Sequence, residues 1–289
     1  MKRCALVSLI VCAALILPLP HHFLPVIQAE AGIQALNGSG HRLDSGLHRS
    51  EVPKAVLAQV QARLAGEVVV ASTSLTAAIA TAAGAKDVRV MTPQGLKHPP
   101  EYELRPSDLL RFEGAKVVVY GGYERMVSKL LETSRSQGLQ AVQVNTEGSP
   151  ENLIEQVRKT ARVLKTEEKA LAWEKGFTQA LSALRSKIAH LSGKRAVVHR
   201  FAEPFARWAG LGVAQIIRPG EITPRAIAEA IAQSPEVVVD VLHFPLAKVI
   251  AENAGCRYVQ IINFPGVDNT NTLEDLFKYN TAQLLRGFQ

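Results

Sequence analysis

Short apolar runs alternate along this chain with segments in which apolar residues recur every three or four positions. Uninterrupted, β-branched runs of four to six residues are typical of strands buried on both faces of a parallel sheet. They predict strands over 68–71, 117–120, 141–144, 196–199, 212–217, 237–241 and 258–262. The helical spacing between them predicts helices over 75–83, 124–136, 205–209, 224–233, 245–254 and 273–286. We therefore expect an α/β fold with two α/β lobes and parallel-rich sheets.

The segment between the two sets of strands has helical spacing throughout and contains no apolar run. Ser149 can cap a helix with Pro150 at its first position, and Gly193 stands where a helix would stop. These signals predict one long rigid helix over 149–192, with Gly176 as its only soft point.

This helix is expected to link an N-terminal lobe of residues 51–148 to a C-terminal lobe of residues 193–289. Ligands of open α/β sheets bind outside the carboxyl ends of the strands. In a protein with two lobes, that rule places the binding site in the cleft between them.

The N-terminus has the features of a secretory signal peptide. A basic start, Met1-Lys2-Arg3, precedes an apolar stretch over 4–17, and Ala29-Glu30-Ala31 supplies a small-x-small cleavage pattern. We expect residues 1–31 to be a signal peptide cleaved after Ala31 and residues 32–50 to be a loose leader. The apolar stretch is shorter than the roughly 20 residues of a spanning helix, so a retained membrane anchor is the less favoured alternative.

The composition excludes several classes of protein. The chain has 289 residues, of which 47% are hydrophobic and 20% charged, and this balance excludes a disordered protein. The net charge is +7, but no dense Lys/Arg block is interleaved with aromatic residues, so we expect no nucleic-acid partner. Cleavage would leave Cys256 as the only cysteine, which excludes an intrachain disulfide.

Enzyme motifs are absent from the predicted mature sequence. It contains no G-x-S-x-G elbow, no P-loop, no G-x-G-x-x-G after a strand and no Cys-x-x-Cys pair. We therefore expect a binding protein and no enzymatic activity.

Four short motifs occur in the order and at the spacing of a known family. They are EYELRPSDL at 101–109, YGGYE at 120–124, SPEN at 149–152 and VVHRFA at 197–202. In them the chain resembles the substrate-binding proteins of zinc and manganese ABC transporters, the cluster A-I or TroA-like family. The resemblance spans about 68–285. It implies a periplasmic monomer that carries zinc or manganese between its lobes to a membrane permease and its ATPase.

The same resemblance locates the metal ligands and shows where this chain departs from them. The family takes one ligand from each of four loops. Pro100 stands at the first position, with His98 two residues upstream, and the second loop, at 145–150, has no histidine. His199 matches the third position, whereas Asn263 stands at the fourth, where the family has an acid.

A histidine outside the family pattern offers a replacement ligand. His243 follows the predicted strand 237–241 by two residues and therefore lies at the same strand end as His199. Three imidazoles suit Zn²⁺, which accepts tetrahedral nitrogen ligands. We expect His98, His199 and His243 to bind the metal. Candidates for a fourth ligand are Glu101, Asp240 and Asn263, with Glu103 and Glu203 as further carboxylates.

Two other functions remain open for this fold. If the metal site has decayed, the cleft would bind another solute such as a metal chelate, through Tyr102, Arg105, Asn145, Arg200 and Asn263. A non-transport role, as an adhesin or as a periplasmic enzyme, is the third hypothesis. The alternative for each candidate histidine is that it is a surface or helix-capping residue and binds no ligand.

Overall fold

A computed structural model describes residues 68–93, 102, 105, 114–124, 127–128, 131, 139–220 and 222–289. All of them belong to one compact unit, Lys54–Gln289. The predicted signal peptide and leader lie outside the described residues, as does most of the helix predicted over 124–136. None of the helices in the described part of the chain is long and apolar enough to cross a membrane.

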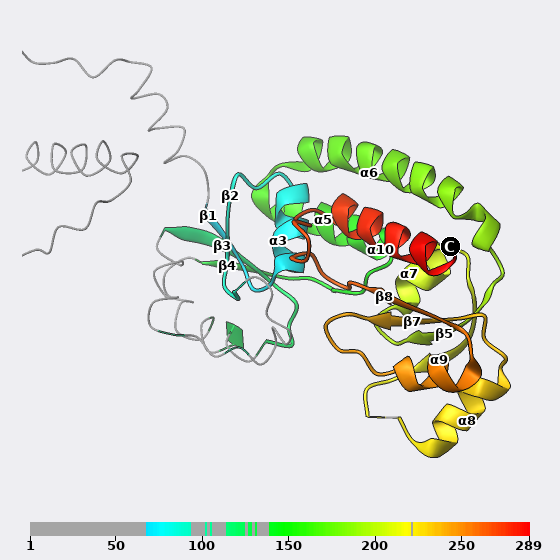
Figure 1. Cartoon of the computed structure of the whole chain (residues 1–289). Helices are drawn as coiled ribbons and strands as arrows, with labels where there is room; N and C mark the ends of the chain where they lie inside the picture. Colours follow the sequence, from blue (N-terminus) through cyan, green and yellow to red (C-terminus); the bar gives the residue numbers. More distant parts are fainter. Residues whose placement is uncertain are drawn as a thin grey trace, which may run out of the picture. The chain divides into compact units, whose positions relative to one another are not determined.

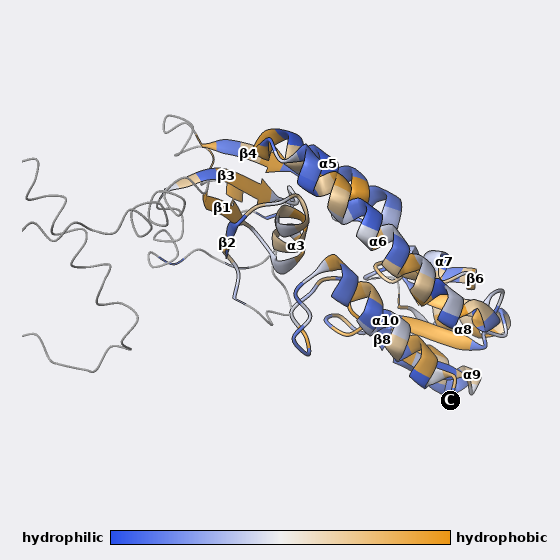
Figure 2. Cartoon of the chain, turned by 90° about the horizontal axis from the view of Figure 1, so that it is seen from above, coloured by the Kyte–Doolittle hydropathy of each residue, from blue (hydrophilic) through white to orange (hydrophobic). Residues whose placement is uncertain are grey.

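The N-terminal lobe is built on a parallel sheet of four strands. The strands are β1 (Val68–Ala71), β2 (Asp87–Val90), β3 (Ala115–Tyr120) and β4 (Gln140–Gln143). Their order is β2-β1-β3-β4, and helix α3 (Ser74–Ala82) follows β1 (Figure 1). The central strands β1 and β3 are the hydrophobic ones (Figure 2), because helices or loops cover both of their faces.

The C-terminal lobe repeats this arrangement. Its strands are β5 (Arg195–His199), β6 (Gly212–Ile217), β7 (Val237–Val241) and β8 (Arg257–Ile261), in the parallel order β6-β5-β7-β8. Its helices are α7 (Glu203–Trp208), α8 (Pro224–Ala232), α9 (Lys248–Ala254) and α10 (Leu273–Gly287). The predicted α/β class with two parallel sheets is confirmed.

Strand β2 was not predicted from the sequence. Among the described strands it lies at the edge of its sheet and pairs with β1 alone, and it is at least partly exposed along its length. An edge strand of this kind does not need an uninterrupted apolar run, and the sequence Asp-Val-Arg-Val has none.

The prediction of one continuous helix over 149–192 is wrong. The structure has two helices there, α5 (Pro150–Leu164) and α6 (Glu167–Lys187), followed by the short 3₁₀ helix η4 (Ala189–Leu191). Lys165 ends α5 in the left-handed conformation, with φ 55°. An ion pair joins Arg158 of α5 to Glu174 of α6, so α6 folds back beside α5. Gly176, the expected soft point, lies inside α6.

The break has causes in both sequence and packing. Thr166 is the N-cap residue of α6, and Glu167 and Glu168 place negative charge in its first turn, where the helix dipole favours it. The Thr166 hydroxyl donates a hydrogen bond to the carbonyl oxygen of Ala83, the C-cap residue of α3. This contact fixes the turn between α5 and α6 against the N-terminal lobe.

The two lobes share one hydrophobic core. It contains residues from both sheets and from α5, α6 and α10. Phe177 of α6 is fully buried and meets Phe277 of α10 edge-on, with 5.7 Å between ring centroids. The Ser74 hydroxyl, at the start of α3, also donates a hydrogen bond of 2.6 Å to the carbonyl of Pro265, after β8. These contacts hold the loops after β8 close to the N-terminal lobe.

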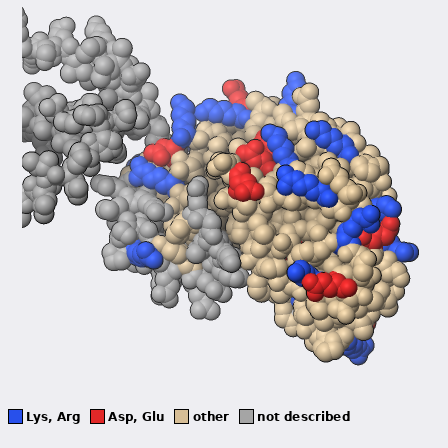
Figure 3. All heavy atoms as spheres, viewed as in Figure 1, with Lys and Arg blue, Asp and Glu red and all other residues tan. Residues whose placement is uncertain are grey.

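Charged side chains of both signs are interspersed over the face drawn in Figure 3. Among the described residues visible there, no large area carries a single sign. Exposed ion pairs in the described part of the chain include Lys194–Glu236 and Arg225–Glu229. Pairs of this kind contribute little to stability, so the core carries most of it.

We expect replacement of Lys165 with glycine to raise the free energy of unfolding by about 0.5–1 kcal/mol, because glycine adopts the left-handed conformation without strain. The matched control is Lys175→Gly, inside α6, which should lower the free energy of unfolding by about 1 kcal/mol. Urea denaturation followed by circular dichroism measures both. Equal destabilisation by the two variants would mean that the helix continues through Lys165.

Candidate functional site

Three of the predicted site residues lie at one edge of the C-terminal sheet. His199 is the last residue of β5, His243 follows β7 by two residues, and Asn263 follows β8 by two residues. The strands β5, β7 and β8 are neighbours and run parallel. Their carboxyl ends therefore bring these side chains to the same edge, where α/β sheets bind ligands.

His199 is fully buried at this edge. Its Nδ1 accepts a hydrogen bond of 3.0 Å from the backbone N–H of Phe201. Its Nε2 is buried and has no hydrogen-bond partner among the described residues. Because Nδ1 presents a lone pair to Phe201, the neutral ring carries its hydrogen on Nε2.

Burial also determines the charge of this ring. It lowers the pKa of His199, and the negative charge of Asp240 opposes that shift only in part. The imidazole is therefore neutral at neutral pH, which is the state that can bind a metal ion.

His243 is held by an aromatic neighbour. Its ring is stacked on Phe264, with 3.8 Å between ring centroids and 26° between the ring planes. The residue is buried, with 8% of its surface exposed. Phe244, the next residue, meets the ring of His199 edge-on, with 6.3 Å between ring centroids. The aromatic residues beside the two histidines thus restrict the rotation of both rings.

Asp240, a predicted candidate for the fourth ligand, accepts several hydrogen bonds from the protein. Its carboxylate accepts hydrogen bonds from the backbone N–H groups of Val241, Leu246 and Ala247 and from the hydroxyl of Tyr258, at 2.7–2.9 Å. Burial and this carboxylate together raise the pKa of the Tyr258 hydroxyl. Asp240 thus holds the β7–α9 loop in place, and its predicted role as a fourth ligand stays a prediction.

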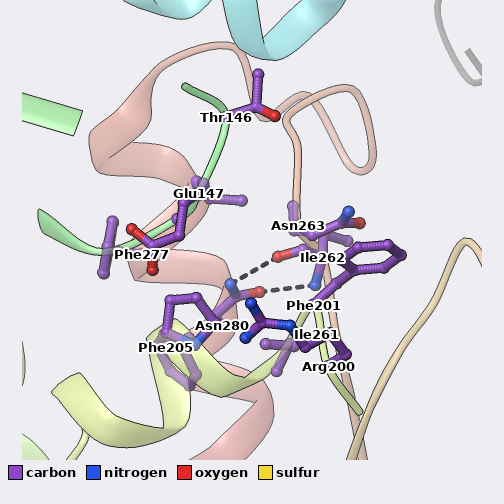
Figure 4. A pocket seen from close by; sticks show the side chains of 13 residues that line it. Thr146, Glu147, Arg200, Phe201, Phe205, Ile261, Ile262, Asn263, Phe277 and Asn280 are labelled. Atoms are coloured by element: carbon purple, nitrogen blue, oxygen red, sulfur yellow. Dashed lines mark hydrogen bonds between the residues drawn. The ribbon is translucent and has the colours of Figure 1, made fainter. Parts of the chain in front are cut away.

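Asn263 is positioned by the helix behind it. The side chain of Asn280, on α10, bonds both the N–H and the C=O of Ile262, at 2.9 Å and 2.8 Å (Figure 4). These bonds fix the backbone just before Asn263. The Asn263 Oδ1 atom is buried and has no hydrogen-bond partner in the described part of the chain.

The segment after β4, where the family pattern has a histidine, is a helix cap. The Asn145 Oδ1 atom accepts the N–H of Glu147 at 3.0 Å, and the Asn152 amide donates to the carbonyl oxygens of both residues. One Glu147 carboxylate oxygen accepts the N–H and the hydroxyl of Ser149. These bonds hold the segment against the start of α5.

The N-terminal lobe contributes a polar cluster that the sequence analysis did not identify as a site. Glu124 is 1% exposed and accepts hydrogen bonds from the hydroxyl of Ser72 and from the N–H groups of Gly121 and Gly122. Tyr123 is 45% exposed as a whole, but desolvation of its hydroxyl and the charge of Glu124 raise its pKa, and this hydroxyl bonds the side chains of Thr146 and Thr73. The only sequence signal for the cluster is the YGGYE motif at 120–124.

A cavity of about 230 Å³ lies between the segment after β4 and the C-terminal lobe. The aromatic side chains of Phe201, Phe205 and Phe277 form much of its wall (Figure 4). Its polar lining includes Glu147 from one side and Arg200 and Asn263 from the other. The lining includes Arg200 and Phe201, which directly follow His199, but neither His199 nor His243 itself.

Arg200 belongs to a small charged group. Glu203 bonds Arg200 through one carboxylate oxygen and Arg207 through the other, the latter at 2.8 Å. Burial raises the pKa of Glu203, but the bonds from Arg207 and Arg200 outweigh it and lower the pKa overall. Glu203 is thus engaged as a counter-ion, and the group carries one net positive charge.

A complete metal site is not visible in the described residues. Among them, no group of three or more His, Cys, Asp or Glu side chains could hold a metal ion. His98, Glu101 and Glu103 lie outside the described residues, so their predicted roles stay predictions. The described part contributes two histidines and the Asn263 amide at one edge.

Comparisons with known proteins identify one family by its model, and solved structures that share the fold. Residues 69–287 match the model of the family described as zinc-uptake complex component A, periplasmic. No curated protein matches the chain.

Solved structures with the same fold include the SBP FpvC of Pseudomonas aeruginosa with Mn²⁺, at 18% identity and TM-score 0.60, over 76% of this chain and 98% of that one. Another is the Mn-bound periplasmic metal binding protein of Candidatus Liberibacter asiaticus, at 14% identity and TM-score 0.61, over 77% and 100%. At these identities the likeness establishes the fold alone.

Proposed function

Because this chain belongs to the family of zinc-uptake complex component A, a family of periplasmic binding components, we propose that it captures a divalent metal ion for import. Zinc is the favoured ion and manganese the alternative. The metal would be bound at the edge of the C-terminal sheet that faces the N-terminal lobe. An ABC importer, formed by a membrane permease and an ATPase, would receive it.

The observation that carries this proposal is the environment of His199. A buried nitrogen without a hydrogen-bond partner is costly unless a ligand completes it. Within the described part of the chain, the Nε2 atom of His199 is such a nitrogen, at a strand end where the family pattern has a ligand. Asn263 places a second polar atom without a partner among the described residues, Oδ1, at the same edge.

The donor types favour zinc. Imidazole nitrogen suits Zn²⁺, whereas Mn²⁺ prefers carboxylate and carbonyl oxygen. We propose His199 and His243 as ligands, with His98 as the third and Glu101 or Asn263 as the fourth. The position of Asp240 does not support its inclusion, because its carboxylate is already bonded by four donors.

Metal binding at Nε2 has a structural consequence. The hydrogen on Nε2 must move to Nδ1, because a neutral imidazole presents only one lone pair. The hydrogen bond from Phe201 to Nδ1 then breaks. We therefore expect the turn of residues 199–202 to rearrange when the ion binds.

Calorimetric titration of the purified chain with Zn²⁺ and with Mn²⁺, together with elemental analysis, tests the proposal. We expect zinc to co-purify and to bind more tightly than manganese, in a one-to-one ratio. Titration after removal of metal by a chelator provides the reference state. Binding no tighter than about 1 mM for either ion would contradict a metal receptor.

A further inference from the structure

We propose that the cavity between the segment after β4 and the C-terminal lobe binds a ligand of its own, a small zwitterionic amino acid with an apolar side chain. The carboxylate of Glu147 binds its ammonium group, and the guanidinium of Arg200 binds its carboxylate. Neither histidine of the proposed metal site takes part, so the inference goes beyond the proposed function and does not depend on it. Asn263 also lines the cavity, but it stays a candidate metal ligand and is not used here.

Two side chains of opposite charge line the cavity without neutralising each other. Glu147 comes from the segment after β4 and Arg200 from the turn after β5, and Figure 4 shows both side chains at the cavity. Both residues are described by the structure, and no ion pair joins them, since Arg200 is paired with Glu203. An amino acid carries the two complementary charges in one molecule and can therefore bind both side chains.

Each of the two side chains keeps hydrogen-bonding capacity for a ligand. Within the described part of the chain, Arg200 donates only through Nη1, to Glu203, so its Nε and Nη2 groups have no acceptor there. Glu147 accepts both bonds from Ser149 through Oε2, and its Oε1 atom has no donor among the same residues. A guanidinium binds carboxylates through parallel N–H groups, and a carboxylate oxygen accepts the hydrogens of an ammonium group.

The acid paired with Arg200 leaves room for an anionic group. Glu203 bonds both Arg200 and Arg207, so the three side chains together carry one net positive charge. A ligand carboxylate at Arg200 compensates that charge, and charge-assisted hydrogen bonds of this kind are stronger than neutral ones.

The rest of the wall suits an apolar side chain. Phe201, Phe205 and Phe277 contribute aromatic rings to it (Figure 4), and Ile261 and Leu276 add aliphatic surface. Phe201 is 50% exposed, and a ligand in the cavity covers part of that apolar surface, which favours binding. We therefore expect the ligand to combine its two charges with a hydrocarbon group.

The volume of the cavity, about 230 Å³, limits the ligand to a small molecule. An apolar protein cavity of roughly 150 Å³ holds one molecule of benzene. A cavity of about 230 Å³ therefore holds a molecule about half as large again, which is the size of leucine. Pockets for drug-sized ligands begin at about 300 Å³, above the volume of this cavity.

Calorimetry of the full chain with L-leucine tests this inference, in the presence of a chelator so that metal takes no part. We expect leucine to bind one-to-one with a dissociation constant below about 1 mM. N-acetylleucine lacks the ammonium charge and leucinamide lacks the carboxylate. Each should bind about tenfold more weakly or worse, because one charge-assisted contact is lost. Ligand-observed NMR measures the weaker ligands.

Two variants assign the charges to their residues. Arg200→Ala should weaken leucine binding by about tenfold or more but leave the affinity for leucinamide unchanged, because leucinamide has no carboxylate. Glu147→Gln should weaken leucine binding similarly but leave the affinity for N-acetylleucine unchanged. The matched controls, Arg207→Ala and Glu151→Gln, change residues outside the cavity lining and should bind leucine like the wild type. Thermal denaturation checks that each variant is folded.

The outcomes separate this inference from the proposed function. The inference is overturned if leucine binds no tighter than about 1 mM, if both analogues bind as tightly as leucine, or if either cavity variant leaves the leucine affinity unchanged. A zinc titration of the same protein without the chelator tests the metal separately. Zinc binding without leucine binding would overturn the inference and leave the metal receptor standing, and leucine binding without zinc binding would do the reverse.

Discussion

Replacement of His199 with alanine is expected to lower the zinc affinity of this protein by about 100-fold or more. Loss of an outer-shell partner of a metal ligand already costs about 10- to 100-fold, and the loss of a ligand exceeds that. Water can occupy the vacated position, but it is a weaker donor than imidazole. Calorimetry or competition with a zinc-binding dye measures the change.

The matched control is His190→Ala, because His190 lies in η4 and is exposed. It should leave the affinity unchanged. His199→Gln tests whether a side chain that fills the same space without an imidazole is sufficient for zinc binding. Urea denaturation confirms that the variants fold. Wild-type affinity in His199→Ala would show that the metal does not bind at the end of β5.

Two companion variants identify the other ligands. His243→Ala should reduce zinc affinity nearly as much as His199→Ala if its ring replaces the missing acid. Asn263→Asp should raise it, because a carboxylate attracts a dication more strongly than an amide does. If His243→Ala leaves zinc affinity unchanged while Asn263→Asp raises it, His243 is excluded as a ligand. If neither variant changes zinc affinity, the metal binds elsewhere.

Replacement of Asp240 with alanine is expected to lower the free energy of unfolding by about 4 kcal/mol or more. The carboxylate accepts four hydrogen bonds in a fully buried position. Its removal leaves three backbone N–H groups and the Tyr258 hydroxyl without that acceptor, at about 1–3 kcal/mol for each group that stays unsatisfied. Urea denaturation of the metal-free protein measures the loss.

Tyr258→Phe provides a graded control, because it removes only one of these four bonds. We expect it to cost about 1 kcal/mol. The pair also tests the role assigned to Asp240. If Asp240→Ala changed stability by less than about 1 kcal/mol but abolished zinc binding, Asp240 would be a metal ligand after all.

The candidate site was predictable only in part. The position of His199, Arg200 and Asn263 after strands indicated the edge at which they meet. The commitment of Asp240 to the loop of residues 241–247 could not be predicted, because it depends on three N–H groups that fold around one carboxylate. The Glu124 cluster was missed for the same reason, since Ser72 and Glu124 are 52 positions apart in the sequence.

The sequence by itself determined the α/β class, seven of the eight strands in the described part of the chain, and the family. Buried central strands need uninterrupted apolar residues, and such runs can be recognised in the sequence alone. The edge strand β2 and the turn at Lys165 were decided by tertiary structure. An edge strand is defined by its single neighbour, and the turn by the contact of Thr166 with Ala83 and by the pairing of α5 with α6. The hydrogen position on His199 was likewise settled in three dimensions, because it follows from the direction of the Phe201 N–H and from the burial of the ring.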